Sequence, residues 1–198
     1  ELNRQQIKKA DLVANPGCYP TASLLGLYPL LQENILKPDS VIIDAKSGVS
    51  GAGKSLKRVT HFIEADENMG AYSPTGHRHT SEIEAIIRGY TDGFSGISFT
   101  PHLAPIKRGI LATIYVRVKD NIKKNELKKL YQETYKNDSF VQVLPAGQLP
   151  QTKYVMGTNY CHLSPQLEER TGLIKILSAI DNLGKGAAGQ AVQNLNLM

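Results

Sequence analysis

Apolar residues recur along the chain with two periods, and these periods predict alternating helices and strands. Between Ile110 and Val118 every second residue is Ile, Ala or Val, a pattern typical of a strand with one buried face in an antiparallel sheet. The segment from Tyr19 to Gln32 is apolar on nearly all sides and has Pro20 in its first turn, so it predicts a buried helix. No internal repeat interrupts this alternation, which indicates one α/β or α+β unit.

The same patterns place the remaining elements. We expect helices from Thr80, which could cap its own helix, to Thr91, from Glu126 to Tyr135 and from Gly186 to Leu197. Strands are expected over residues 41–45, 97–102, 158–162 and 173–180, and around residue 141. A further helical face could be formed by Leu56, Val59, Phe62 and Ile63. Connections are short and no Pro/Gly/Ser-rich linker divides the sequence, so residues 1–198 are expected to form a single domain.

Composition narrows the class of protein. With 41 % hydrophobic and 21 % charged residues among 198, the chain is typical of a globular protein rather than a disordered one. The longest apolar stretch, Ala22 to Leu31, is too short to span a membrane. The net charge of +5 suits small anionic ligands but is too diffuse to indicate nucleic-acid binding.

Two cysteines cannot form a disulfide framework, and no charged-then-apolar leader opens the sequence, so we expect a reducing, cytoplasmic setting. Because the chain begins at Glu1 without Met, we expect an excised or processed piece of a longer protein.

A glycine-rich segment, Gly48 to Ser55, satisfies the phosphate-loop pattern G-x-x-x-x-G-K-[ST]. In that pattern the glycines let backbone N–H groups cradle phosphates, Lys54 would add positive charge, and Ser55 would bind Mg²⁺. Asp181, at the end of a predicted strand, could help hold the metal. The segment therefore allows a nucleotide kinase, or simply a glycine-rich loop that needs positive φ angles.

A second candidate site is the turn Asn15 to Thr21, where Cys18 leads directly into the predicted buried helix. The positive end of the helix dipole lowers the pKa of a thiol placed there, and the thiolate is a nucleophile. Cys18 could equally be a small buried apolar residue, as most free cysteines are. Cys161, inside a predicted strand, is expected to be structural.

Two further clusters carry side chains that could transfer protons or bind an anion. His77 and His79 flank Arg78 just before a predicted helix and could exchange protons near neutral pH or lie on the surface without a role. No carboxylate or cysteine has convincing ligand spacing to His61, His77 or His79, so we predict no metal site. Lys107 and Arg108 join two predicted strands and could hold a phosphate or carboxylate, or be solvated turn residues.

Taken together and in this order, these segments resemble the N-acetyl-γ-glutamyl-phosphate reductases, enzymes of arginine biosynthesis. The matching stretches are residues 13–21 (VANPGCYPT), 46–53 (KSGVSGAG), 76–83 (GHRHTSEI), 99–105 (FTPHLAP) with Arg108-Gly109, and 182–191 (NLGKGAAGQA). In that family the glycine-rich loop usually continues with Arg, so the resemblance implies that Lys54 makes the phosphate-loop pattern a by-product, and it argues against a kinase.

The resemblance implies a fold and a domain organisation. The catalytic domain of this family is like that of glyceraldehyde-3-phosphate dehydrogenase, with a mixed, largely antiparallel sheet and helices packed on it. The dinucleotide-binding Rossmann domain that precedes it has no counterpart before Cys18, and the family's last short segment after Met198 is also absent. The chain is thus expected to be the catalytic and dimerisation domain alone, inactive by itself.

The resemblance also implies a reaction. Cys18 would attack the acyl phosphate of N-acetylglutamate to form a thioester, which NADPH, bound mainly by the absent domain, would reduce to the 5-semialdehyde. His79 and His77 would carry the protons, and the substrate would be bound by Arg108, Lys107 and Asn15. The nicotinamide pocket would be lined by Ser47, Gly48, Ser50, Gly51, Gly53 and Asn182. We expect a homo-oligomer, a dimer or tetramer, that binds neither nucleic acid nor membrane. The alternative within this class is the aminoadipyl-phosphate reductase of lysine biosynthesis.

Overall fold

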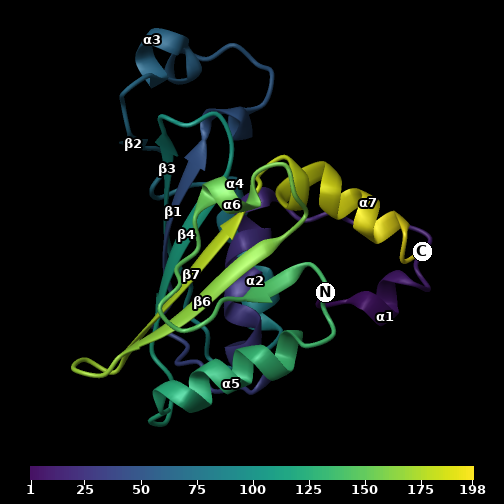
Figure 1. The fold of residues 1–198 in the computed structure, drawn as a ribbon, viewed down its shortest axis with the longest axis vertical. Helices are drawn as coiled ribbons and strands as arrows, with labels where there is room; N and C mark the ends of the chain where they lie inside the picture. Colours follow the sequence, from purple (N-terminus) through teal and green to yellow (C-terminus); the bar gives the residue numbers. More distant parts are fainter.

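The computed structural model describes residues 1–198 and is built around one twisted seven-stranded sheet (Figure 1). The strand order is β2-β3-β1-β4-β7-β6-β5. Four of the six neighbouring pairs are antiparallel, and the pairs β1/β3 and β5/β6 are parallel. The predicted mixed, largely antiparallel sheet is therefore confirmed.

The strand bounds agree well with the sequence pattern at the centre of the sheet. The strands are β1 (Ile42–Gly48), β2 (Gly70–Ala71), β3 (Ser98–Ala104), β4 (Ile110–Val116), β5 (Val141–Val143), β6 (Cys161–Glu168) and β7 (Leu173–Ile180). Alternation in β4 buries Ile110, Ala112, Ile114 and Val116 completely, as predicted. The strand expected at residues 158–162 instead begins at Cys161 and runs to Glu168, where it pairs with β7 along its whole length.

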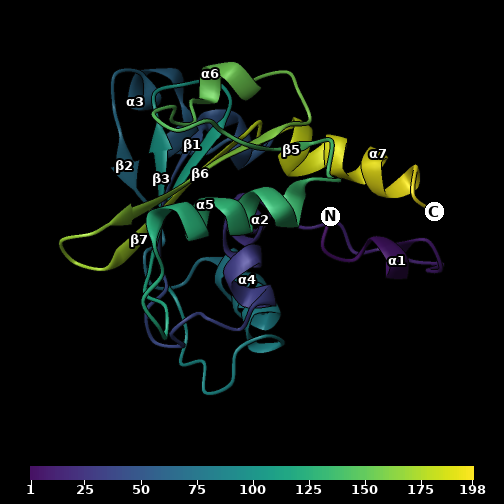
Figure 2. The ribbon, with the colours of Figure 1, turned by 60° about the horizontal axis from the view of Figure 1, so that its bottom comes forward.

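Three helices cover one face of the sheet (Figures 1 and 2). They are α2 (Cys18–Gln32), which packs on β4 and β7, α4 (Arg78–Arg88), which packs on α2, and α5 (Lys124–Tyr135), which packs on β5 and β6. The shorter elements are α1 (Arg4–Ile7), η1 (Val49–Ala52), η2 (Arg58–Thr60), α3 (Phe62–Ala65), α6 (Thr152–Val155), the π-helical turn η3 (Gly184–Ala188) and α7 (Gly189–Leu195). None of the helices is both long enough and apolar enough to cross a bilayer.

The central helix α2 contains a proline, and Tyr135 of α5 supplies the donor that the proline lacks. Pro29 has no N–H, so the carbonyl of Leu25 loses its usual helical donor. The hydroxyl of Tyr135 donates to that carbonyl at 2.5 Å, and the hydroxyl of Tyr131 donates to the next one, Gly26, at 2.6 Å. Both bonds are buried, so α2 stays continuous beneath the sheet despite the proline.

Two predictions about the helices are wrong. The helix α4 begins at Arg78, and its N-cap is His77, whose Nδ1 accepts the N–H of His79, so Thr80 lies inside the first turn. The chain after Gly53 forms only the short turns η2 and α3, and Leu56 and Phe62 are almost fully exposed. The helical spacing there has no surface to pack against, because the segment projects from the sheet (Figure 1).

Candidate active site

The N-terminus of α2 brings Cys18 to one end of the sheet. Gly17 is the N-cap, with an extended backbone, and its carbonyl accepts both the N–H and the hydroxyl of Thr21. Cys18 is thereby the first helical residue and is partly exposed, whereas Cys161 is fully buried. The sequence prediction that Cys18 leads directly into a buried helix is confirmed.

Behind the cysteine, the π-helical turn η3 packs closely. A Cβ added to Gly186 would lie 2.9 Å from the Cβ of Cys18. The neighbouring Lys185 is completely buried, and its Nζ contacts Glu1 Oε1 at 2.5 Å and Gln193 Oε1 at 2.7 Å. This buried ion pair fixes the turn that supports Cys18 from behind.

His79 lies directly against the backbone that precedes Cys18. A Cβ added to Gly17 would lie 2.5 Å from His79 Nε2, so only glycine lets the imidazole approach this turn. The ring of His77 is 4.8 Å from that of His79, centroid to centroid. Both imidazoles also pack edge-on against Tyr19, at 5.6 and 5.9 Å. The structure therefore joins the cysteine turn and the two histidines into one cluster.

The ionisation of this cluster is set mainly by burial. Loss of solvent, together with the nearby His77 and Arg78, lowers the pKa of His79 to about 4, so its imidazole is neutral at pH 7. Burial also raises the pKa of the Cys18 thiol above its usual value of 9.0, although the backbone N–H groups of Tyr19 and Cys18 and the charge of Arg78 oppose the increase. The expected lowering of the Cys18 pKa is therefore wrong for this chain, because desolvation outweighs the helix terminus.

Two residues of the cluster were not identified from the sequence. Glu82 accepts the N–H of Gly17 at 3.0 Å and so ties α4 to the cysteine turn. Tyr72 donates to the hydroxyl of Tyr19 at 3.0 Å and lies 5.5 Å from the ring of His77. Glu82 stands within the GHRHTSEI stretch, so its motif was noticed, but only the fold shows its contact with Gly17.

The glycine-rich loop does not form a phosphate cradle. The N–H groups of Gly48, Val49 and Ser50 donate to carbonyls of Gly109, Ile106 and Lys107. The expectation that the loop offers these backbone donors to a ligand is wrong, because the neighbouring 106–109 segment uses them. The following Lys54 and Ser55 are exposed and no helix begins there, so the strand–loop–helix context of a phosphate loop is missing.

The loop nevertheless joins the cluster of residues predicted to bind a cofactor. Asn182 donates to Ser50 Oγ at 3.0 Å and accepts the N–H of Gly109 at 2.6 Å. A Cβ on Gly51 would lie 2.9 Å from Ser47 Oγ and 3.6 Å from Asn182 Nδ2. Gly53 has a φ of 75°, which explains its need for glycine. Ser47, Gly48, Ser50, Gly51 and Asn182 thus share one wall of the site.

Asp181 holds this wall to the neighbouring loops. Its carboxylate forms an ion pair with Arg108 Nε at 2.7 Å and accepts the N–H groups of Gly157, Leu183 and Gly184. Despite its burial, these partners lower its pKa. The proposed use of Asp181 as a magnesium ligand is wrong, because its oxygens are already occupied.

Comparison with known proteins identifies the fold. A family described as "Semialdehyde dehydrogenase, dimerisation domain" matches residues 18–182. The chain belongs to this family. Aspartate semialdehyde dehydrogenase II from Vibrio cholerae has the same fold, with a TM-score of 0.74 and 16 % identity over 98 % of this chain and 65 % of that one. A probable aspartate-semialdehyde dehydrogenase from Pseudomonas aeruginosa superposes with a TM-score of 0.71 at 15 % identity.

Much more similar sequences carry a different name. The chain is 58 % identical to the N-acetyl-gamma-glutamyl-phosphate reductase of Halothermothrix orenii, 55 % to that of Desulforudis audaxviator and 51 % to that of Bacillus subtilis. Each match covers all of this chain and 57 % of the relative. The chain therefore spans little more than half the length of these relatives.

The three residues predicted to bind the substrate differ in their surroundings. Arg108 keeps part of its guanidinium exposed beside the ion pair with Asp181, and Lys107 is exposed. Both groups of the Asn15 amide are engaged, since it donates to the carbonyl of Ala187 at 3.2 Å and accepts from Asn194 at 3.0 Å. In this structure Asn15 fastens the cysteine turn to α7.

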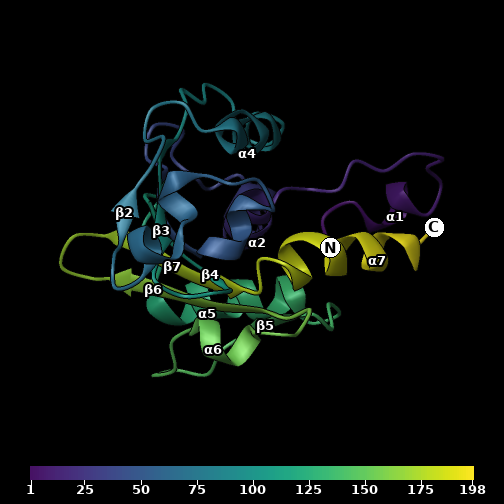
Figure 3. The ribbon, with the colours of Figure 1, turned by 90° about the horizontal axis from the view of Figure 1, so that it is seen from above.

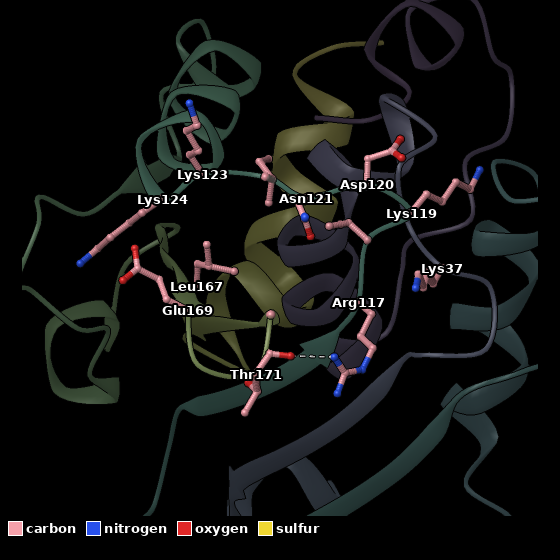
Figure 4. Close-up of a pocket in the computed structure, with 13 residues that line it drawn as sticks. Lys37, Arg117, Lys119, Asp120, Asn121, Lys123, Lys124, Leu167, Glu169 and Thr171 are labelled. Atoms are coloured by element: carbon pink, nitrogen blue, oxygen red, sulfur yellow. Dashed lines mark hydrogen bonds between the residues drawn. The ribbon is translucent and has the colours of Figure 1, made fainter.

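Two cavities are relevant to the position of the site. One, of about 660 Å³, lies between the N-terminal segment and α2 and is bordered by Asn15, Pro16 and Glu82 of the cysteine turn and α4. Another, of about 490 Å³, opens beside the start of α5 and the β6–β7 hairpin (Figure 4). It is lined by several basic side chains, including Arg117, whose guanidinium donates to the carbonyl of Thr171, and it contains none of the predicted site residues. Of the two, only the larger cavity is bordered by residues of the cysteine turn and α4.

Proposed function

We propose that this chain is the catalytic and dimerisation domain of an N-acetyl-γ-glutamyl-phosphate reductase. The observation that supports the proposal is the close approach of His79 to Gly17, the residue before the partly exposed Cys18, together with the neutral state of the His79 imidazole. The names of the relatives, at 51–58 % identity over the whole chain, support this substrate over the aspartate compound named for the structural neighbours.

Cys18 is proposed as the nucleophile. Its sulfur attacks the acyl carbon of the acyl phosphate, the carbon–oxygen bond to phosphate breaks, and a thioester on Cys18 remains. The N–H groups at the start of α2 act on this thiolate, since those of Cys18 and Tyr19 already favour the charged form. Arg78 and Arg108 are proposed to attract the anionic substrate through their positive charges.

His79 and His77 are proposed as proton carriers. A neutral His79 can accept the thiol proton as the sulfur attacks the acyl carbon, which a protonated imidazole cannot do. Its Nδ1 is buried and has no hydrogen-bond partner, so one polar atom of the ring is left for another group. His77 Nδ1 is engaged by the N–H of His79, so its Nε2 is the atom that can exchange a proton. After reduction, one of these rings protonates the oxygen of the tetrahedral intermediate to give the thiohemiacetal, and takes that proton back as the carbon–sulfur bond breaks and the aldehyde and the Cys18 thiolate are released.

NADPH is proposed to supply the hydride that reduces the thioester. The wall formed by Ser47, Gly48, Ser50, Gly51 and Asn182, with Gly53 at its end, is proposed to line the nicotinamide pocket, and Gly51 keeps it narrow because a side chain there would collide with Ser47 Oγ. Arg108 and Lys107 are proposed to bind the phosphate or carboxylate of the substrate. Asn15, in the cysteine turn, is proposed as a third substrate-binding residue. The whole protein is proposed to be a cytoplasmic homo-oligomer, a dimer or tetramer.

The test uses the full-length protein with its preceding domain. Cys18→Ser should abolish NADPH-dependent reduction of N-acetyl-γ-glutamyl phosphate while NADPH binding, measured by fluorescence, is retained. Cys161→Ser is the matched control and should keep turnover, because that thiol is sealed in the core with a pKa of about 12. Substantial turnover by Cys18→Ser would eliminate the covalent mechanism. Faster reduction of an aminoadipyl phosphate than of the glutamyl compound by the unaltered protein would overturn the proposed substrate.

A further inference from the structure

The cavity of about 490 Å³ beside the start of α5 is far from Cys18. Three parts of the chain form it: the segment after α2, the segment between β4 and α5, and the β6–β7 hairpin. Cys18 is the first residue of α2, whose 15 residues span about 22 Å, and the cavity lies beyond the other end of this helix. Figures 1–3 place the hairpin on the side of the molecule opposite to both termini.

The lining of this cavity is strongly basic. It carries five positive and two negative side chains, a net charge of +3, which is more than half of the +5 of the whole chain. None of the five cations forms an ion pair with a carboxylate. Figure 4 shows two of them on one side of the opening, two on the other and one between. In that order they are Lys123 and Lys124, Lys37 and Lys119, and Arg117.

Two of the cations are held in place by hydrogen bonds to neutral groups. The guanidinium of Arg117 donates to the carbonyl of Thr171 at 2.9 Å, which leaves its other N–H groups for a ligand. Lys119 Nζ donates to the carbonyl and the side-chain oxygen of Asn34, both at 2.8 Å. The N–H of Lys37 donates to the carbonyl of Arg117, which ties two walls together. Cations positioned in this way lose less freedom when an anion binds.

The start of α5 has an unfavourable charge. Lys123 is its N-cap and Lys124 its first residue, although positive side chains are disfavoured at the positive end of a helix dipole. Glu126 accepts the N–H of Lys123 at 2.9 Å, but the N–H groups of Lys124 and Asn125 have no protein partner. A bound anion would compensate the lysines, the dipole and the free N–H groups together. Departures from local rules of this kind are expected at functional sites.

The cavity also has an apolar part. It is formed by Val118, Ile122 and Leu167, which are partly buried against the core. The volume falls within the roughly 300–1,000 Å³ of small-molecule sites. The cavity therefore has room for an organic group beside several anionic ones.

We propose that this cavity binds a polyphosphate, such as the phosphate chain of a nucleoside triphosphate. Arg117 and the four lysines pair with the phosphate oxygens, and the start of α5 donates its free N–H groups to one phosphate. The carboxylates of Asp120 and Glu169 reduce the positive charge of the lining without balancing it. The site shares no residue with the Cys18 cluster, so it is independent of the proposed reductase function.

The experiment measures binding to the full-length protein by calorimetry, with tripolyphosphate and ATP as probes. NADPH is present at saturation, so that a nucleotide is not counted at the site proposed for that cofactor. Lys123→Gln with Lys124→Gln should raise the Kd for tripolyphosphate about tenfold, and Lys37→Gln, on the opposite wall, at least about threefold. Lys128→Gln with Lys129→Gln is the matched control, because both residues belong to α5 but neither lines the cavity. Its Kd should stay within about twofold of the unaltered value.

Thermal unfolding separates lost binding from lost structure. Without a ligand the Lys123/Lys124 variant should be at least as stable as the unaltered protein, because it removes positive charge from a helix N-terminus. The increase in Tm that tripolyphosphate gives the unaltered protein should largely disappear in this variant. Tighter binding of ATP than of tripolyphosphate would identify a nucleotide as the ligand, and equal binding an inorganic polyphosphate. Absence of binding by both probes, or equal losses in the two double variants, would overturn the proposal.

Discussion

His79 Nε2 lies so close to Gly17 that any side chain at position 17 would collide with the imidazole. The backbone of Gly17 itself is ordinary, with φ −68° and ψ 163°. The glycine is thus required by its neighbour and not by its own conformation. At this contact the N-terminus of α2, which carries Cys18, meets the N-terminus of α4, which carries His79.

Gly17→Ala should therefore displace His79 and the cysteine turn from each other. We expect a loss of roughly 1–3 kcal/mol in the free energy of unfolding from overpacking and a decrease of about 100-fold in kcat from misplacement of the reacting groups. Gly70→Ala is the control, because a Cβ there meets nothing within 4 Å and its φ is not in the left-handed region. Equal kinetics for the two alanine variants would show that the contact is not needed for turnover.

The ionisation of His79 should make stability depend on pH in a defined direction. Its folded pKa of about 4 lies below the ordinary value of 6.5, so between these values the unfolded chain binds a proton that the folded chain does not. The free energy of unfolding should then fall by roughly 3 kcal/mol as the pH is lowered from about 6.5 to about 4, with no contribution from His79 above that window.

Denaturant unfolding at several pH values, compared between the unaltered chain and His79→Gln, measures this contribution. The variant should have a shallower decrease in stability over the window. NMR titration of the His79 ring gives the same pKa independently, and a folded value at or above 6.5 would contradict the assignment of a neutral imidazole.

The tyrosine that repairs α2 should contribute measurably to stability. Tyr135→Phe keeps the buried ring but leaves the carbonyl of Leu25, already without a donor because of Pro29, unsatisfied. We expect a loss of about 1–3 kcal/mol in the free energy of unfolding, measured by urea denaturation. Tyr28→Phe is the matched control, since Tyr28 lies in the same helix, is only partly buried and donates to neither of these carbonyls, and its effect should stay within about 0.5 kcal/mol. A loss of similar size in both would mean that the bond to Leu25 has no special value.

Much of the central sheet and its helices could be predicted from the sequence, because each of these elements buries a regular pattern. The strand at Leu173–Ile180 and the helix ending at Gln32 were predicted to the residue at those bounds. The strand β6 was misplaced, since Ser164 and Gln166 interrupt its apolar pattern while its pairing with β7 continues. Long-range hydrogen bonds therefore set this strand where local periodicity does not.

The candidate site was predicted in part. The motifs named Cys18, His77 and His79, and the fold brings these segments together, but the roles of the site residues stay predictions. Whether burial or the helix terminus dominates the thiol pKa depends on solvent access, which no sequence pattern reports. The same holds for the glycine-rich loop, where the carbonyls that engage Gly48, Val49 and Ser50 come from a segment nearly sixty residues away. The spacing of Leu56, Val59, Phe62 and Ile63 was helical, yet these side chains are exposed, because periodicity cannot tell whether the fold offers a surface for them to pack against.

The carboxylate of Asp181 limits how this domain can be re-engineered. It anchors Arg108, Gly157 and the Leu183–Gly184 turn at once, so three otherwise independent loops share a single fastening. A library that varies the Lys107–Gly109 loop would also disturb the Leu183–Gly184 turn, which leads to Gly186 beside Cys18. Efforts to change selectivity should therefore keep Arg108 and Asp181 together and vary the positions around them.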